Sequence, residues 1–210
     1  MLKSLASRGK MIRIIGPKNK NDGEYINTTS RSNNWSKGLS PFFVGPIKLW
    51  GDYVAHNLEN AWQYSKVYNG YVDNDGNPSS SWFEWAEKGW RDTIAHRYPM
   101  PKGVMPLYSY WDGEHLNYVE ARLRIYIPLY GEAVRKTEAF KILKEIYDSK
   151  KDITLWDFDG YDYLKMNRSL LQVALDPNRK MGHAFVLAML LTGQFDDIVK
   201  DKRDQNLRLT

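Results

Sequence analysis

The segment that most constrains the fold is MGHAFVLAMLL, residues 181–191, because it is apolar on almost every side. A helix of this composition has no face suited to water, so the rest of the chain has to enclose it. Gly193 follows at a position where helices commonly end. The sequence therefore predicts a buried helix near the end of the chain.

Most of the other predicted elements are also helices, and three of them begin with capping residues. These are Asn57, the pair Ser81 and Glu84, and the pair Ser169 and Gln172. The first helix is expected to run to residue 68, and the second to the proline at position 99. A helix over residues 118–126 is predicted to stop at Pro128, and a longer one over residues 129–149 follows it.

The strand signals are few and short. Residues 11–16 (MIRIIG) and 152–158 (DITLWDF) each indicate a strand, and residues 39–54 contain two apolar runs that indicate a small antiparallel ribbon. The segment from Pro101 past Pro106 is expected to be a loop. Strands and helices do not alternate as in a doubly wound sheet. We therefore expect a mainly helical α+β protein, with one compact domain and a few short strands.

Three regions are expected along the chain. Residues 1–20 form a basic N-terminal extension that includes the first strand, residues 21–193 form the compact domain, and residues 194–210 form a polar C-terminal tail. The net charge is +5, and six basic residues precede the first acidic one: Lys3, Arg8, Lys10, Arg13, Lys18 and Lys20. Such a segment can bind nucleic-acid phosphates or can be a solvated tail, and the sequence leaves both open.

The composition excludes several kinds of site. The chain has no cysteine, so it holds neither a disulfide nor a thiolate metal site. Its four histidines lack metal-ligand spacing. His183, inside the apolar run, is expected to be a core residue, with a position facing the site beside Gly182 as the alternative. No phosphate-binding glycine motif is present. We therefore expect neither a metal nor a cofactor.

The sequence also contains no membrane-targeting signal. No stretch approaches the roughly 20 apolar residues that span a bilayer. The first residues lack the apolar core, about 7–15 residues long, of a signal peptide. We expect a cytoplasmic protein without a membrane partner. Its eight Trp and fourteen Tyr suit a core, and they also suit a pocket for a nucleobase or a sugar.

One polar face is a candidate site. In NLENAWQYSKVY, residues 57–68, a helical spacing places Glu59, Gln63 and Lys66 within roughly 60° of one another. A charged face of this kind is commonly solvated. The same acid, amide and amine are also a set that can bind and cleave a ligand. The residues alone leave both interpretations open.

This segment resembles the opening signature of the NADAR family, also called YbiA-like proteins. The resemblance rests on Glu59, Gln63 and Lys66 in LSPFFVGPIKLWGDYVAHNLENAWQYSKVY and on residues that precede them: Ser40, Phe42, Phe43, Pro46, Ile47 and Gly51. Two later blocks follow in the family's order, ITLWDFDG and NRKMGHAFVLAML. The resemblance covers about residues 38–192, so residues 21–193 are expected to be a NADAR-like catalytic domain.

The chain also departs from the family pattern. Asn60 stands where the family usually has His, and Tyr53-Val54 where it usually has Trp. The loop over residues 69–80 and the N-terminal extension have no clear counterpart. The resemblance is therefore to a divergent branch. These departures also motivate an alternative, in which the pocket binds an ADP-ribose-like nucleotide or a modified base without cleaving it.

The resemblance implies a metal-independent N-glycosidase. Some family members hydrolyse riboflavin-pathway intermediates, and others remove ADP-ribose from modified guanine in nucleic acid, which reverses a toxin. Such members occur in bacteria and their viruses, so the expected location is the bacterial or virus-infected cytoplasm. We expect the second activity here, on ADP-ribosylated nucleic acid or a nucleotide-like small molecule. No obligate protein partner is indicated.

The resemblance also implies roles for individual residues. Glu59 would stabilise or attack the oxocarbenium-like centre, or act as acid and base. Lys66 would form a Schiff base with the opened sugar or hold a phosphate as a fixed cation. Gln63 would orient ribose hydroxyls.

Further ligand contacts are expected from two later blocks and one helix. Trp156 would stack on a base or pack in the core, and Asp157 or Asp159 would bind ribose hydroxyls. Asn178 and Gly182 would form a turn that lets the backbone approach the ligand. The adjacent pair Trp90 and Arg91 is a weaker candidate, near a phosphate of the ligand.

Overall fold

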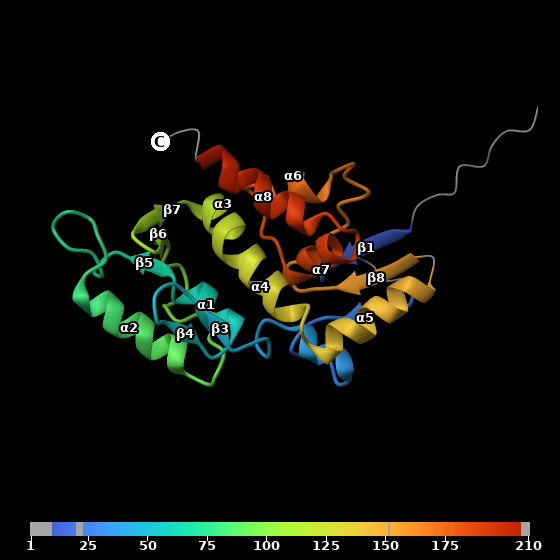
Figure 1. The fold of residues 1–210 in the computed structure, drawn as a ribbon, viewed down its shortest axis with the longest axis horizontal. Helices are drawn as coiled ribbons and strands as arrows, with labels where there is room; N and C mark the ends of the chain where they lie inside the picture. The colour runs from blue at the N-terminus through green and yellow to red at the C-terminus, as the bar shows by residue number, and fades with distance from the viewer. Residues whose placement is uncertain (1–9, 20–22, 151, 207–210) are drawn as a thin grey trace, which may run out of the picture.

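The computed structural model describes residues 10–19, 23–150 and 152–206, and Figure 1 shows how its elements are arranged. Lys3, Arg8 and Lys20 of the expected basic extension lie outside these residues. Lys10 and Arg13 are described, and both bind the folded chain. Lys10 Nζ donates to Tyr147 O at 2.8 Å, and Arg13 pairs with Asp162 at 2.8 Å. These two charges are therefore engaged within the protein.

The two predicted strands far apart in sequence lie side by side in one parallel sheet. Its order is β1 (Met11–Ile15), β8 (Asp152–Trp156) and β2 (Ile26–Asn27). Ile14 is opposite Leu155, and both are fully buried. The strand that the sequence analysis assigned to an extension thus belongs to the core of the fold. Residues 26–27 add the edge strand, which pairs with β8.

The remaining strands are antiparallel. β3 (Ile47–Lys48) pairs with β4 (Val54–Ala55), which confirms the predicted ribbon. A second sheet contains β5 (Lys66–Tyr68), β6 (Pro106–Trp111) and β7 (Glu114–Leu116). The prediction of a loop after Pro106 was therefore wrong. Proline is tolerated there because it is the first residue of its strand, where its missing N–H breaks no interior bond.

The helix predicted over residues 57–68 is shorter than expected. Asn57 caps it as predicted, since its side chain accepts from Asn60 N, but α1 spans only Leu58–Gln63. Lys66 lies instead at the start of β5, opposite Ser109. Val67 and Tyr68 favour strand over helix, and pairing with β6 buries them. Likewise α2 (Ser80–Arg91) ends at Arg91, well before the proline at position 99. Its cap is Ser79, so the predicted capping box of Ser81 and Glu84 was wrong.

The break predicted at Pro128 does not occur. α3 (Tyr118–Ala121), the π-helix η2 (Arg122–Tyr126) and α4 (Ile127–Val134) follow one another without interruption. In the π-helix the N–H of Ile127 reaches back five residues to Arg122 O, and Pro128 then occupies the first turn of α4. Pro128 has no N–H to donate to the preceding turn, and the wider π-turn stands directly before it, where the chain stays helical.

The single helix predicted over residues 129–149 is wrong: α4 ends at Val134, and α5 (Glu138–Ser149) starts anew after its cap Thr137. The capping box of α6 (Leu170–Leu175) is confirmed. α7 (His183–Leu191) is buried over most of its length and Gly193 follows with φ +71°, which confirms the central prediction. The expected polar tail is instead helical as α8 (Phe195–Asn206), and it buries Phe195 and Ile198.

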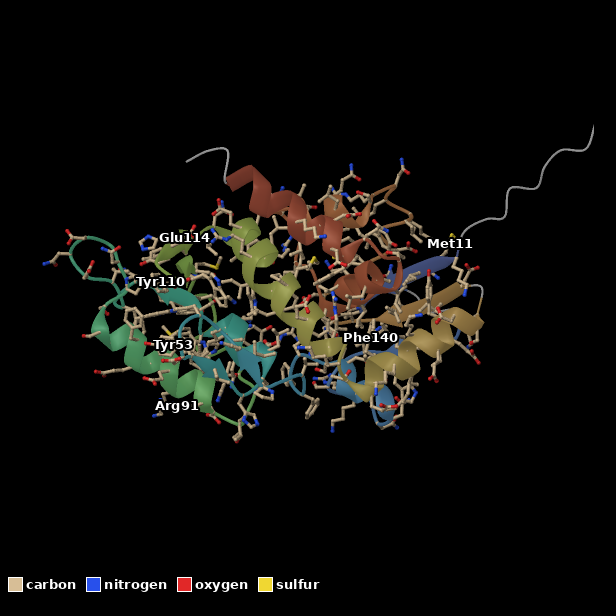
Figure 2. All side chains as sticks on the ribbon, in the orientation of Figure 1. Met11, Tyr53, Arg91, Tyr110, Glu114 and Phe140 are labelled. Atoms are coloured by element: carbon tan, nitrogen blue, oxygen red, sulfur yellow. The ribbon has the colours of Figure 1, made fainter. Side chains whose placement is uncertain are left out.

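The elements form two groups on either side of one long helix. In Figure 1 the parallel sheet, α5 and α7 lie on one side, and α2 with the β5–β6–β7 sheet lies on the other, while α3–α4 runs between them. Figure 2 labels Phe140 in the first group and the aromatic residues Tyr53 and Tyr110 in the second. The fold is therefore α+β, with short sheets and a predominance of helix, as expected. None of the helices in the described ranges has both the length and the apolar character needed to cross a membrane.

The place of β1 in the core can be tested at Gly16, directly after that strand. A Cβ atom at Gly16 would lie 2.1 Å from the backbone oxygen of Gly160, which cannot move aside as a side chain would. We expect Gly16→Ala to lower the free energy of unfolding by about 1–3 kcal/mol. The matched variant Gly23→Ala, with open space around it, should change stability little. Urea denaturation measures both, and equal stability of the two variants would contradict this packing.

Candidate active site

A cavity of about 990 Å³ lies where segments from both groups of elements meet. Seven segments contribute to its wall: residues 29–30, 40–42, 97–106, 157–159 and 177–183, together with side chains from α1–β5 and from α3–η2. The polar face singled out in the sequence opens into this cavity, since Glu59, Gln63 and Lys66 all line it. That face is therefore not solvated surface.

These three side chains form one hydrogen-bonded chain. Gln63 Nε2 donates to Glu59 Oε1 at 2.9 Å, and Lys66 Nζ donates to Gln63 Oε1 at 2.6 Å. The ammonium group also lies 5.0 Å from the ring centroid of Trp62. Gln63 thus binds the carboxylate with one end of its amide and the amine with the other. Its predicted contact with ribose hydroxyls would use the second N–H of Nε2 or the second lone pair of Oε1.

Burial shifts the pKa values of the acid and the amine toward each other. Burial lowers the pKa of Lys66 to about 8, against the nearby charge of Glu59, which raises it. Burial also raises the pKa of Glu59, although Gln63, Arg97 and Lys66 act in the opposite direction. An amine with a pKa near 8 is partly unprotonated at neutral pH, and a buried carboxyl group of raised pKa can exchange protons.

A buried ion pair stands on the other side of the cavity. His183 Nδ1 lies 3.0 Å from Asp157 Oδ2, and His183 Nε2 donates to Thr28 O at 2.7 Å. Both ring nitrogens therefore face acceptors, which favours the imidazolium. Although burial opposes the charge, Asp157 raises the pKa of His183, and the imidazolium in turn holds the pKa of Asp157 below its usual value against burial. His183 is buried and hydrogen-bonded, as the sequence analysis expected.

Asp157 also joins the end of β8 to the start of α7. Its Oδ2 accepts from Ala184 N at 2.9 Å, and its Oδ1 accepts from Asp159 N at 3.2 Å. A Cβ atom at Gly182 would lie 2.2 Å from Asp157 Oδ2, so this contact requires glycine. Gly182 therefore admits the Asp157 carboxylate, which is a different role from the expected approach of backbone to ligand.

The remaining predicted residues divide into two sets. Asp159 and Asn178 line the cavity, and Asp159 pairs with Arg97 at 3.1 Å. Trp156 does not line it and packs against Phe158, with ring centroids 4.9 Å apart. Its predicted stacking on a base finds no support in the geometry, because Trp156 is not among the residues that line the cavity.

Trp90 and Arg91 also lie away from the cavity. Trp90 is 1% exposed and belongs to the aromatic core, where its ring meets Trp50 at 5.2 Å. The side chain of Arg91 is 74% exposed and pairs with Glu87 one turn earlier. Figure 2 shows Arg91 at the outer end of α2. Both positions follow from α2 placing its apolar stripe inward and its charged face in water.

Sequence analysis missed the aromatic wall of the cavity. Trp62 packs edge-on against Tyr126, with centroids 5.3 Å apart, and Tyr118 lies 6.4 Å from the same indole. Phe158 faces the cavity from the loop after β8, and Arg97 stacks over it at 5.4 Å. The high aromatic content indicated pockets of this kind in general. It could not show which rings gather, because their positions come from three separate elements.

The segment 97–106 forms one edge of the cavity mouth. Tyr98 is 72% and Met105 78% exposed although both line the cavity. Asn60 holds the start of this segment: its Nδ2 donates to Asp92 O and Ile94 O, and its Oδ1 accepts from His96 N at 2.8 Å. Asn60 itself is fully buried and does not line the cavity. The departure from the family at this position thus changes no group on the cavity wall.

Three cations complete the mouth. Lys102, Arg179 and Lys180 are exposed, line the cavity and form no ion pair within the part of the chain that the structure describes. The acids Glu59, Asp157 and Asp159 are matched inside by Lys66, His183 and Arg97. The mouth is therefore positively charged, which suits an anionic ligand.

The described residues include no cluster of three or more His, Asp or Glu side chains arranged to hold a metal ion. Comparison of the chain with protein-family models, with curated proteins and with solved structures finds no match in any of the three. The interpretation of the cavity therefore depends on its own residues.

The interaction between Glu59 and Lys66 predicts a change in the pKa of Lys66 that can be measured. Glu59→Gln removes the negative charge that raises the pKa of Lys66, so this pKa should fall below its value of about 8. NMR titration of ¹³C-dimethylated lysines, with Lys66→Arg to assign the signal, reports it. Glu87→Gln, on the exposed face of α2, is the control. A Lys66 pKa that stays unchanged in Glu59→Gln would contradict the coupling.

The Asp157–His183 pair predicts a pH-dependent loss of stability. The raised pKa of His183 stabilises the fold below its ordinary value of 6.5, and the lowered pKa of Asp157 stabilises it above its ordinary value of 3.8. Asp157→Asn should therefore destabilise most between these values, by about 3–5 kcal/mol, and less above pH 8. Urea denaturation at pH 5.5 and 8.5 tests this, with the exposed Asp196→Asn as control. A loss independent of pH would contradict it.

Proposed function

We propose that this protein is a NADAR-like N-glycosidase that releases ADP-ribose from a modified base, with guanine in nucleic acid as the favoured target. The observation that carries the proposal is the Glu59–Gln63–Lys66 chain, buried at the wall of a large cavity. The acid and the amine carry shifted pKa values, and such pairs in clefts are typical of catalytic sites. The sequence resemblance assigns the same residues to the same chemistry.

The proposed reaction breaks the bond between the anomeric carbon and the base nitrogen. The bonding electron pair leaves with the base, and the carbon becomes oxocarbenium-like. Glu59 stabilises this positive charge as a carboxylate and then accepts a proton from the water that adds to the carbon. The raised pKa of Glu59 suits a group that takes up a proton and releases it.

Lys66 has two candidate roles that the chemistry separates. As a neutral amine it attacks the aldehyde of the opened sugar, and loss of water gives an imine. As an ammonium it attracts a phosphate or a ribose oxygen. Its position one amide away from Glu59 and its pKa of about 8 are compatible with both. Borohydride reduction distinguishes them, because only the imine leaves a stable sugar adduct on Lys66.

The cavity mouth supports a nucleotide-like substrate. The aromatic walls from Trp62 and Phe158 suit planar bases, and the cations Lys102, Arg179 and Lys180 suit a diphosphate or a nucleic-acid backbone. The exposed Tyr98 and Met105 add apolar surface beside these charges. A base within duplex DNA has to be flipped out to enter, so a single strand is the simpler substrate.

The decisive experiment measures ADP-ribose released from an oligonucleotide that carries ADP-ribosylated guanine, by mass spectrometry. We expect release by the wild type and a loss of about 10²–10⁴-fold in Glu59→Gln, as for other acid–base groups. Lys66→Ala should lose activity to a similar extent. Arg91→Ala, a cation outside the cavity, is the matched control and should retain it.

The outcomes separate the candidate functions. Binding of the oligonucleotide by all these proteins without release would establish a reader of the modified base and overturn the enzyme. Neither binding nor release would redirect the search to small substrates of the riboflavin-intermediate type. Activity retained by Glu59→Gln would overturn the mechanism.

A further inference from the structure

Tyr126 carries a hydroxyl group that the proposed reaction does not use. It is the last residue of η2, its side chain is 8% exposed, and it lines the cavity. Its ring is fixed between Trp62, which meets it edge-on at 5.3 Å, and Tyr130, which lies parallel to it at 6.3 Å. The ring is thus held by packing while its polar end faces the cavity.

Tyr130, one turn further along the same helix, provides a direct comparison. Tyr130 is also buried, but its Oη donates to Leu39 O at 2.6 Å and it does not line the cavity. Tyr126 Oη forms no hydrogen bond with any residue in the described ranges. The hydroxyl is not enclosed by protein, so it is free to bind a group that enters the cavity. A bound ligand is a partner that would account for the position of Tyr126.

The π-helix explains how Tyr126 comes to face the cavity. It spans Arg122 and Tyr126, and both side chains line the cavity. Arg122 is held in place because its guanidinium donates to the carbonyls of Val173, Asp176 and Arg179. Such π-segments occur frequently at functional sites. The wider turn, with Arg122 as its anchor, therefore fixes the direction of the Tyr126 side chain.

The neighbouring charges indicate which ligand group Tyr126 can bind. Burial raises the pKa of Tyr126 well above its usual value, and the charges of Asp157 and Glu59 raise it further, so the hydroxyl keeps its proton and donates. A phosphate oxygen can accept from Tyr126, but an ionised phosphate has no proton to donate to these carboxylates. A sugar hydroxyl can accept from Tyr126 and donate to a carboxylate at the same time.

We propose that Tyr126 Oη donates a hydrogen bond to a hydroxyl of the ribose whose anomeric carbon reacts, and so selects a ribose at this position of the cavity. The assignment rests on the proposed function, because ADP-ribose is the ligand that brings a ribose there. It concerns binding alone, so it holds for an enzyme and for a reader.

Calorimetric titration with ADP-ribose tests this assignment. We expect Tyr126→Phe to bind about 3- to 10-fold more weakly than the wild type, the loss of one hydrogen bond, with an unchanged Tm. Tyr130→Phe is the matched control. It should bind like the wild type but lower the Tm by about 2–4 °C, since it leaves Leu39 O unpaired.

Deoxy analogues of ADP-ribose locate the contact. The wild type and Tyr126→Phe should bind an analogue that lacks the hydroxyl contacted by Tyr126 with equal affinity. For the analogue that lacks the other hydroxyl, the wild type should still bind more tightly than Tyr126→Phe. Equal affinity of both proteins for ADP-ribose would overturn the role of Tyr126 and leave the proposed function standing. A difference that persists with both the 2-deoxy and the 3-deoxy ribose would overturn the sugar contact. Failure of the wild type to bind ADP-ribose would overturn the proposed function and this assignment together.

Discussion

The contact on which the site depends most is the buried ion pair between Asp157 and His183. Asp157 follows β8, and its carboxylate binds both His183 and Ala184 N at the start of α7, while the other nitrogen of His183 binds Thr28 O. Three segments distant in sequence are thereby fixed at one corner of the cavity. Because an unpaired charge here would be costly, the pair favours one arrangement of β8 and α7 over alternatives of similar packing.

Side-chain amides hold a second part of the cavity wall. Gln63 lies between Glu59 and Lys66. Its amide binds the carboxylate at one end and the amine at the other, so the two charged groups form no direct salt bridge. A direct salt bridge would stabilise the charged forms of Glu59 and Lys66. Without that contact, burial is the larger effect, and it raises the pKa of Glu59 and lowers the pKa of Lys66. Asn60 binds three backbone groups of the segment that leads to the cavity mouth. This arrangement gives the site an amine with a pKa of about 8 and a carboxyl group whose pKa burial raises.

Several features followed from the sequence. The apolar run 181–191 required burial, and the caps Asn57 and Ser169 fixed helix starts because their side chains bind the first free N–H groups locally. Lys66 shows where prediction from residue spacing fails. Its spacing from Glu59 and Gln63 suggested one helix, but pairing with β6 ends that helix at Gln63. The three side chains still meet, since the turn at residues 64–65 returns Lys66 to Gln63.

The sequence by itself determined the buried helix α7, the predominance of helix and the polar set Glu59, Gln63 and Lys66, because these depend on composition and on contacts between residues close along the chain. Only the tertiary structure decided that β1 lies beside β8, that Trp156 and Trp90 do not line the cavity, and that Tyr126 does. Such choices depend on pairing and packing between distant segments. The energies of these contacts are not encoded in any local pattern of residues.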